Sequence, residues 1–148
     1  MDFVPAIKSG FKNCFKFTGR ASRSEYWFFY LFFVLSLMAV LMVSMLLGGL
    51  LRGAAPESTA NDTGAAIMAS VFAIAMLLYF LAMFFPILSL IVRRLHDSDK
   101  SAWFILLYFV PFGGIVMFVF FCLPGTRGPN QFGEDPLRTP ATVANTFA

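Results

Sequence analysis

Apolar and charged residues are segregated along this chain into long blocks. No charged residue occurs in three runs, which cover residues 26–51, 65–92 and 102–123. Each run is longer than the roughly 18 consecutive apolar residues that indicate a transmembrane helix. The pattern predicts an all-α integral membrane protein with three apolar helices behind an amphipathic N-terminal segment. We expect the apolar helices over residues 23–51, 65–92 and 102–123, and the amphipathic segment over residues 1–22.

The third run allows two topologies. It contains the sequence YFVPFGG at residues 108–114, so a proline and two glycines lie near its middle. We expect one span that is kinked at Pro111. The alternative is a re-entrant hairpin that turns at the glycines and brings the chain back to the side from which it came. Non-helical backbone at that depth needs protein or water around it.

The N-terminal segment has two stripes with helical spacing. The apolar stripe recurs every four residues, at Phe3, Ile7, Phe11 and Phe15. The basic stripe follows one position later, at Lys8, Lys12 and Lys16. On a helix the two stripes lie side by side, about 100° apart. We expect this helix to lie in the membrane interface, with the lysines against anionic lipid heads. The alternative is a short helix that packs against the other helices.

The first apolar helix has a start signal in its sequence. Residues 22–25 read SRSE, in which the Ser22 hydroxyl can accept from the Glu25 amide while the Glu25 carboxylate reaches back to the Ser22 amide. The helix is therefore expected to begin at Arg23. Aromatic side chains near the ends of the runs suit an interfacial belt. They are Tyr26, Trp27, Tyr30 and Trp103.

Lysine and arginine are unevenly distributed between the segments that flank the runs. Five of them precede the first run and three lie within residues 93–100, whereas residues 52–64 carry Arg52 alone. Cytoplasmic segments of membrane proteins carry the excess of lysine and arginine. We therefore expect the N-terminus and residues 93–101 in the cytoplasm and residues 52–64 outside. Residues 1–137 are expected to form one membrane domain, and residues 138–148 a flexible tail.

Composition agrees with a membrane location. The 148 residues are 59% hydrophobic and 13% charged, whereas about a quarter of a soluble domain is charged. The net charge of +3 is small, and nothing besides it favours nucleic-acid binding. Cys14 and Cys122 are too few and too far apart for a disulfide framework or a metal site, so we expect free thiols.

The most concentrated chemistry lies between the second and third runs. Residues 91–103 read IVRRLHDSDKSAW. If the first two helices form a hairpin, this stretch and residues 18–27 face the same side of the membrane. The side chains brought together would then include Arg20, Arg23, Glu25, Arg93, Arg94, His96 and Asp97. Mixed charges near the interface, where the dielectric is lower than in water, favour a network of ion pairs.

Three interpretations of this cluster remain open. In the first, the arginines lie at a helix end and set topology, while Asp97, Asp99 or Ser101 caps the next helix. In the second, the paired arginines bind a phosphate or a phospholipid head through bidentate hydrogen bonds. In the third, His96 and the two aspartates hold a metal, although their spacing is not that of a sharp ligand set.

The three polar segments, taken in order, resemble a known family. They read FTGRASRSEYWFF at residues 17–29, VRRLHDSDKSAWF at 92–104 and PGTRGPNQFGEDP at 124–136. These segments are similar to the motifs of the bacterial inner-membrane family labelled domain of unknown function 805, the YhaH-type small membrane proteins. The matching positions are Gly19, Arg20, Ser22, Arg23, Glu25, Tyr26 and Trp27, then Arg93, Arg94, Leu95, His96, Asp97, Ser101 and Trp103, then Asn130, Gly133, Asp135 and Pro136. The resemblance implies an integral inner-membrane protein and brings no established activity.

Two positions depart from the family pattern. Members often have glycine where this chain has Ala102, and tyrosine where it has Phe132. The second change removes a hydroxyl, and with it any role that the hydroxyl has.

The leading functional hypothesis is a small non-enzymatic membrane protein. It would bind anionic lipid or a membrane-protein partner, or form homo-oligomers, and it would need no cofactor or metal. A transporter or channel subunit is the second hypothesis, although the runs lack the ionisable residues that usually mark ion paths. The third is a membrane enzyme acting on a lipid or phosphate, with His96 as acid or base beside Asp97. No nucleophile accompanies that pair, so we assign no catalytic residue.

Overall fold

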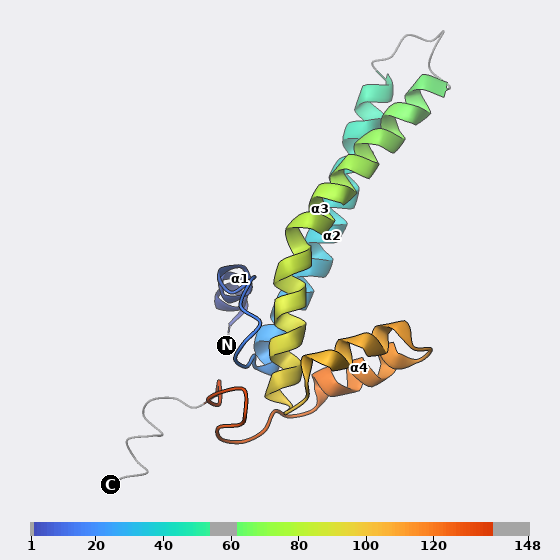
Figure 1. Cartoon of the computed structure of the whole chain (residues 1–148). Coiled ribbons are helices and arrows are strands. Elements are labelled where there is room, and N and C mark those ends of the chain that lie inside the picture. Colours follow the sequence, from blue (N-terminus) through green and yellow to red (C-terminus); the bar gives the residue numbers. More distant parts are fainter. Residues whose placement is uncertain (1, 54–61, 138–148) are drawn as a thin grey trace. The chain divides into compact units, whose positions relative to one another are not determined.

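The computed structural model describes residues 2–53 and 62–137, and this part of the chain is helical (Figure 1). The elements are α1 (Phe3–Lys12), α2 (Arg23–Gly53), α3 (Asp62–Asp97), the 3₁₀ helix η2 (Ala102–Phe109) and α4 (Gly113–Cys122). The expected outer loop lies mostly outside the described residues, and the expected tail, 138–148, lies entirely outside them.

The chain divides into two compact units. The first unit takes its described residues from Met1–Tyr30 and Phe85–Ala148, and the second unit is drawn from Leu31–Phe84. The long helices α2 and α3 each contribute to both units. The candidate chemistry lies in the first unit.

The second unit consists of the later part of α2 and the earlier part of α3, which lie side by side. The Tyr79 hydroxyl donates to the Phe33 carbonyl at 2.7 Å and lies 3.1 Å from Ser36 Oγ. The outward side chains are apolar, as Met42 illustrates with 73% exposure. In the described part of the chain, two stretches are long and apolar enough to cross a membrane, Arg23–Leu51 and Gly64–Asp97.

The start of α2 agrees with the predicted cap in part. The helix begins at Arg23, and the Glu25 amide donates to Ser22 Oγ at 3.3 Å. The Glu25 carboxylate is instead turned toward α1 and α3, where it contacts Ser9 and Arg93. The end of the second long helix also differs from the end expected at residue 92. The α3 helix continues to Asp97, so the charged residues of RRLHD form its last turn rather than a loop.

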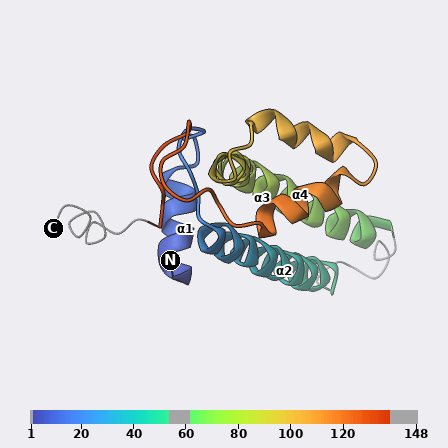
Figure 2. The same cartoon turned by 90° about the horizontal axis from the view of Figure 1, so that it is seen from below.

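The third apolar run does not form the single kinked span that we expected. It forms two short helices, η2 and α4, which run side by side in opposite directions (Figure 2). The turn is tight, with the Gly113 amide donating to the Val110 carbonyl at 2.9 Å. A Cβ atom on Gly113 would collide with the carbonyl of Leu107, so the close approach of the two limbs requires glycine. We call residues 102–123 the apolar hairpin.

The N-terminal helix is shorter than its two stripes suggested. It ends at Lys12, so Phe15 and Lys16 lie beyond it. Ala6 and Gly10 are buried, and the helix packs on α2 through two pairs of rings. These pairs are Phe3 with Phe28, and Phe11 with Phe29. The packing matches the alternative of a helix folded against its neighbours, and the lysines remain exposed. The interfacial location stays a prediction.

The core of the first unit joins the start of α2, the end of α3 and the apolar hairpin. Its buried apolar members are Ala21, Tyr26, Phe29, Leu90, Leu95, Met117 and Phe121. Tyr26, expected at the lipid interface, is only 6% exposed because it packs on Phe121 with ring centroids 4.5 Å apart. Trp27 is half-buried, whereas Trp103 is 77% exposed.

Candidate functional site

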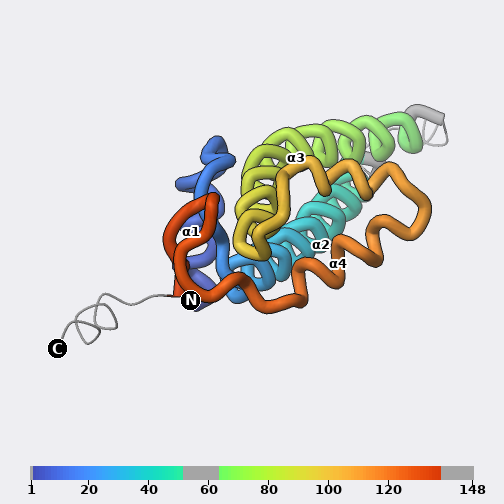
Figure 3. Tube along the Cα trace, turned by 60° about the horizontal axis from the view of Figure 1, so that its bottom comes forward, coloured from blue at the N-terminus to red at the C-terminus, as the bar shows by residue number. Residues whose placement is uncertain are grey.

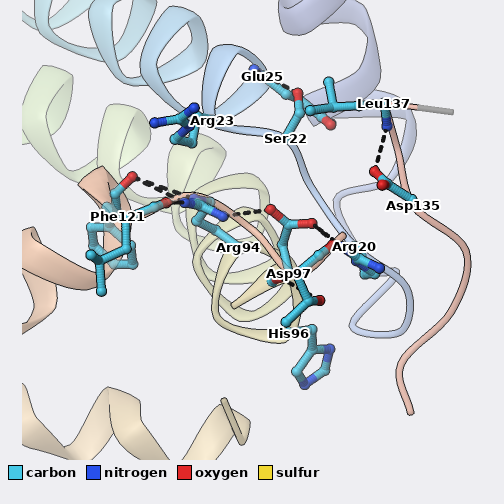
Figure 4. A network of polar contacts seen from close by, with 12 residues as sticks. Arg20, Ser22, Arg23, Glu25, Arg94, His96, Asp97, Phe121, Asp135 and Leu137 are labelled. Carbon is cyan, nitrogen blue, oxygen red and sulfur yellow. Dashed lines mark hydrogen bonds and ion pairs between the residues drawn. The ribbon is translucent and has the colours of Figure 1, made fainter. Parts of the chain in front are cut away.

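Asp97 joins two arginines from different polar segments of the chain (Figure 4). Its Oδ1 lies 2.9 Å from Nη2 of Arg20, and its Oδ2 lies 2.6 Å from Nη1 of Arg94. These three side chains are 0–6% exposed. Charged hydrogen bonds in such a low-dielectric environment are short and strong. We call Arg20, Glu25, Arg93, Arg94 and Asp97 the ion-pair cluster.

Arg20 attaches the C-terminal segment, residues 124–137, to this cluster. Its Nη1 donates to the Gly128 carbonyl at 2.6 Å, and its Nη2 donates to the Thr126 carbonyl. The Thr126 amide in turn donates to the Asp97 carbonyl at 2.8 Å. Figure 3 shows the result, with the red C-terminal segment beside the blue chain that precedes α2. A guanidinium offers several donors in one plane, which an ammonium does not, so this attachment requires arginine.

Arg94 holds the end of the apolar hairpin. Its Nη2 and Nε donate to the Phe121 carbonyl at 3.3 and 3.4 Å, and Nη2 also donates to the Leu123 carbonyl. Carbonyls in the last turn of a helix have no partner inside the helix. Arg94 supplies that partner and places a positive charge at the negative end of the α4 dipole.

Arg93 and Glu25 form the second buried pair. Nη1 of Arg93 lies 3.1 Å from Oε1 of Glu25, which also accepts from the Ser9 hydroxyl at 2.7 Å. This confirms that Glu25 lies beside one of the paired arginines, as the hairpin of the first two helices predicted. The other Arg93 donors, Nε and Nη2, are buried and have no acceptor among the described residues. Glu25 is therefore the group that compensates the buried charge of Arg93.

His96 packs against an aromatic ring of the C-terminal segment. Its ring stacks on Phe132 with centroids 3.9 Å apart and an interplanar angle of 2°. Nδ1 lies 3.3 Å from the Gly19 carbonyl, and the His96 carbonyl accepts from Asn130 Nδ2 at 2.9 Å. The stack needs only an aromatic ring at position 132. Phenylalanine can therefore form it as well as the tyrosine that family members often have there. Within residues 2–53 and 62–137, no group of three His, Cys, Asp or Glu side chains is placed to hold a metal.

The basic groups that remain accessible are not the paired arginines. Arg93 and Arg94 are 4% and 0% exposed, whereas Arg23 and Arg127 are exposed. Both exposed arginines line a cavity of about 240 Å³ between the start of α2 and the C-terminal segment. Arg20, Asp97 and Asp135 also line it. Of the seven side chains expected to come together, Arg23 is exposed beside this cavity and the other six are buried.

Several residues important to the cluster were missed as site residues. Gly125 passes so close to Asp97 that a Cβ atom would collide with the carboxylate. Asp135 closes the C-terminal segment on itself by accepting from the Gly128 amide at 3.1 Å and the Leu137 amide at 2.9 Å. A signal was present in PGTRGPNQFGEDP, whose turn-forming residues predict an ordered polar loop. Its contacts with Arg20 were not readable from that pattern.

The contacts of Arg20, Arg94 and Asp97 bring together three polar segments that lie far apart in the sequence. The family model described as "Protein of unknown function (DUF805)" matches residues 14–134, which include every segment of the ion-pair cluster. The chain belongs to this family. The predicted resemblance to DUF805 is therefore confirmed.

Two relatives from Escherichia coli (strain K12) give the extent of the similarity. The chain is 39% identical over 126 residues to "Inner membrane protein YhaI", which covers 84% of this chain and 89% of the relative. It is 36% identical over 130 residues to "Inner membrane protein YhaH", which covers 87% and 93%. No solved structure matches the chain.

Replacing Glu25 by glutamine tests the Arg93 pair. The change keeps the side-chain shape but leaves the Arg93 charge buried without a carboxylate, and breaking a buried pair typically costs about 3–5 kcal/mol. We expect a clearly lower thermal midpoint in detergent. Glu134→Gln is the matched control, because Glu134 is exposed. Equal midpoints for the two variants would show that the pair carries no weight in the fold.

Gly125→Ala tests the contact between the C-terminal segment and Asp97. The added methyl group must displace either the carboxylate or the loop, so we expect a lower thermal midpoint and faster tryptic cleavage at Arg127. The control is Gly114→Ala, since a Cβ atom on Gly114 meets nothing within 4 Å. Unchanged cleavage in the Gly125 variant would contradict the docking of this segment.

Proposed function

We propose that this protein is a small, non-enzymatic, two-span protein of the bacterial inner membrane that binds the phosphate head of an anionic lipid on its cytoplasmic side. The names of the relatives and the two long apolar helices support the membrane location. The N-terminus, the turn after α3 and the C-terminal segment lie in the cytoplasm in this proposal. The excess of lysine and arginine on these segments supports that orientation.

The observation that carries the lipid proposal is the cavity lined by the exposed Arg23 and Arg127. Arg23 is the first residue of α2, so the cavity lies at headgroup level if α2 spans the membrane. Arginine forks match the geometry of phosphate oxygens. Arg20 also lines the cavity, but its charge is paired with the Asp97 carboxylate and its donors are used by the protein, so the charge offered to a phosphate is that of Arg23 and Arg127.

The N-terminal segment supplies a second, less specific attraction. Lys8, Lys12 and Lys16 are exposed, and each basic group near an anionic membrane surface contributes about 1 kcal/mol. This attraction depends on charge rather than on a fixed geometry.

The use of the charged side chains favours binding over catalysis. Arg94 and Asp97 are engaged with each other and with backbone groups, and the His96 ring is stacked on Phe132. A catalytic acid or base needs access to a substrate proton. These buried contacts support a structural role for the RRLHD residues.

The proposal predicts that Arg23→Gln with Arg127→Gln removes a tightly retained lipid. Native mass spectrometry after release from nanodiscs that contain phosphatidylglycerol and phosphatidylethanolamine would detect it. We expect loss of retained phosphatidylglycerol and an unchanged thermal midpoint, because both side chains are exposed. The matched control is Lys8→Gln with Lys12→Gln, which also removes two charges. That variant should bind anionic vesicles more weakly overall but keep the retained lipid.

Equal retention of phosphatidylglycerol by the arginine variant and the unmodified chain would contradict the headgroup site. Equal loss in the arginine and lysine variants would show that only net charge matters.

A further inference from the structure

The apolar hairpin presents large apolar side chains on its outer surface. Trp103, Phe109, Phe112 and Ile115 are 63–85% exposed, and no charged residue occurs between residues 102 and 123. A protein in water rarely exposes a continuous apolar surface of this extent. The hairpin therefore needs an apolar environment.

The two limbs are too short to cross a bilayer. The eight residues of η2 span about 16 Å at 2.0 Å per residue. The ten residues of α4 span about 15 Å at 1.5 Å per residue. The hydrocarbon core is about 30 Å thick, so each limb matches roughly one leaflet at most.

Both ends of the hairpin are attached to the same polar surface. Ser101 caps η2 through the Trp103 amide, and a turn of three residues separates it from Asp97, the last residue of α3. At the other end, Arg94 holds the carbonyls of Phe121 and Leu123. The chain thus enters and leaves the hairpin beside the ion-pair cluster, and the hairpin reaches out to one side of it (Figures 1 and 2).

The contacts of α4 also indicate a shallow depth. Phe118 lies against Trp27, with ring centroids 5.8 Å apart. Tyr30 and Tyr108 line one cavity of about 220 Å³ with α4 residues. Tyr30 is about 10 Å along the helix from Arg23 at 1.5 Å per residue. The hairpin therefore lies beside the first turns of α2.

The turn at the tip satisfies much of its own backbone. The amides of Val110, Gly113 and Ile115 donate to carbonyls within the hairpin at 2.9–3.0 Å. Pro111 has no amide hydrogen to satisfy. Unpaired backbone groups are what excludes irregular loops from lipid, and these hydrogen bonds reduce that cost.

We infer that the apolar hairpin is embedded among the acyl chains of the cytoplasmic leaflet and does not reach the outer leaflet. The partner of this surface is lipid hydrocarbon rather than a second protein. The inference rests on the membrane orientation of the proposed function but does not depend on the headgroup cavity.

A fluorescent label at the tip tests the insertion. The background carries Cys14→Ser and Cys122→Ser, and Phe112→Cys receives the label in vesicles of phosphatidylethanolamine and phosphatidylglycerol. Lipids with a nitroxide on the acyl chain should quench this label several-fold more than iodide in the water does. Glu134→Cys is the control in the exposed C-terminal segment and should show the opposite preference. Quenching of the tip by iodide would overturn the inference, and so would protection from both quenchers, which indicates a protein cover.

The side of the membrane from which two cysteines react distinguishes this inference from the proposed orientation. Lys8→Cys and Glu134→Cys should react with a membrane-impermeant maleimide from the same, cytoplasmic side. Reaction from opposite sides would show that the hairpin crosses the membrane and would overturn the inference. Reaction of both from the outside would overturn the proposed orientation and, with it, the leaflet assigned to the hairpin, whereas its insertion into a single leaflet would stand.

Discussion

The carboxylate of Asp97 holds together polar segments that lie far apart in the sequence. Its two oxygens receive the guanidinium groups of Arg20 and Arg94, and all three side chains are buried. The same guanidinium groups reach the backbone of the C-terminal segment and the end of α4. Burying these charges is costly unless they are paired and hydrogen-bonded. The positions of the C-terminal segment and the hairpin therefore depend on one carboxylate and its two partners.

The first unit buries its ion-pair cluster and exposes large apolar side chains on the apolar hairpin. Arg94 is 0% exposed, whereas Phe109 is 85% exposed. This arrangement is the reverse of that in a water-soluble domain and suits a protein whose surroundings are largely lipid. It also restricts where a polar ligand can bind, because the buried guanidinium groups are occupied by internal acceptors. In the proposed function, the exposed arginines beside the cavity are the groups that contact a phosphate.

The sequence was sufficient for features that depend on local pattern. The start of α2 at Arg23 followed from SRSE, and the approach of Glu25 to Arg93 followed from pairing the first two helices. The hairpin could not be distinguished from a span by composition, since both are apolar. It depends on a contact between Gly113 and Leu107 and on the hydrogen bonds of Arg94 to α4. The acceptors of Arg20 could not be predicted from the sequence either. They are backbone carbonyls, which every residue type carries.

A double-mutant cycle between Arg20 and Asp97 tests the central role of this carboxylate most directly. Arg20→Gln, Asp97→Asn and the double variant would be compared by their free energies of unfolding in one detergent. Residues that share a buried network couple by about 0.5–3 kcal/mol. We predict coupling in the upper part of that range, with the double variant less damaged than the sum of the single variants. Additive effects, within about 0.5 kcal/mol, would contradict the dependence of the surrounding segments on this pair.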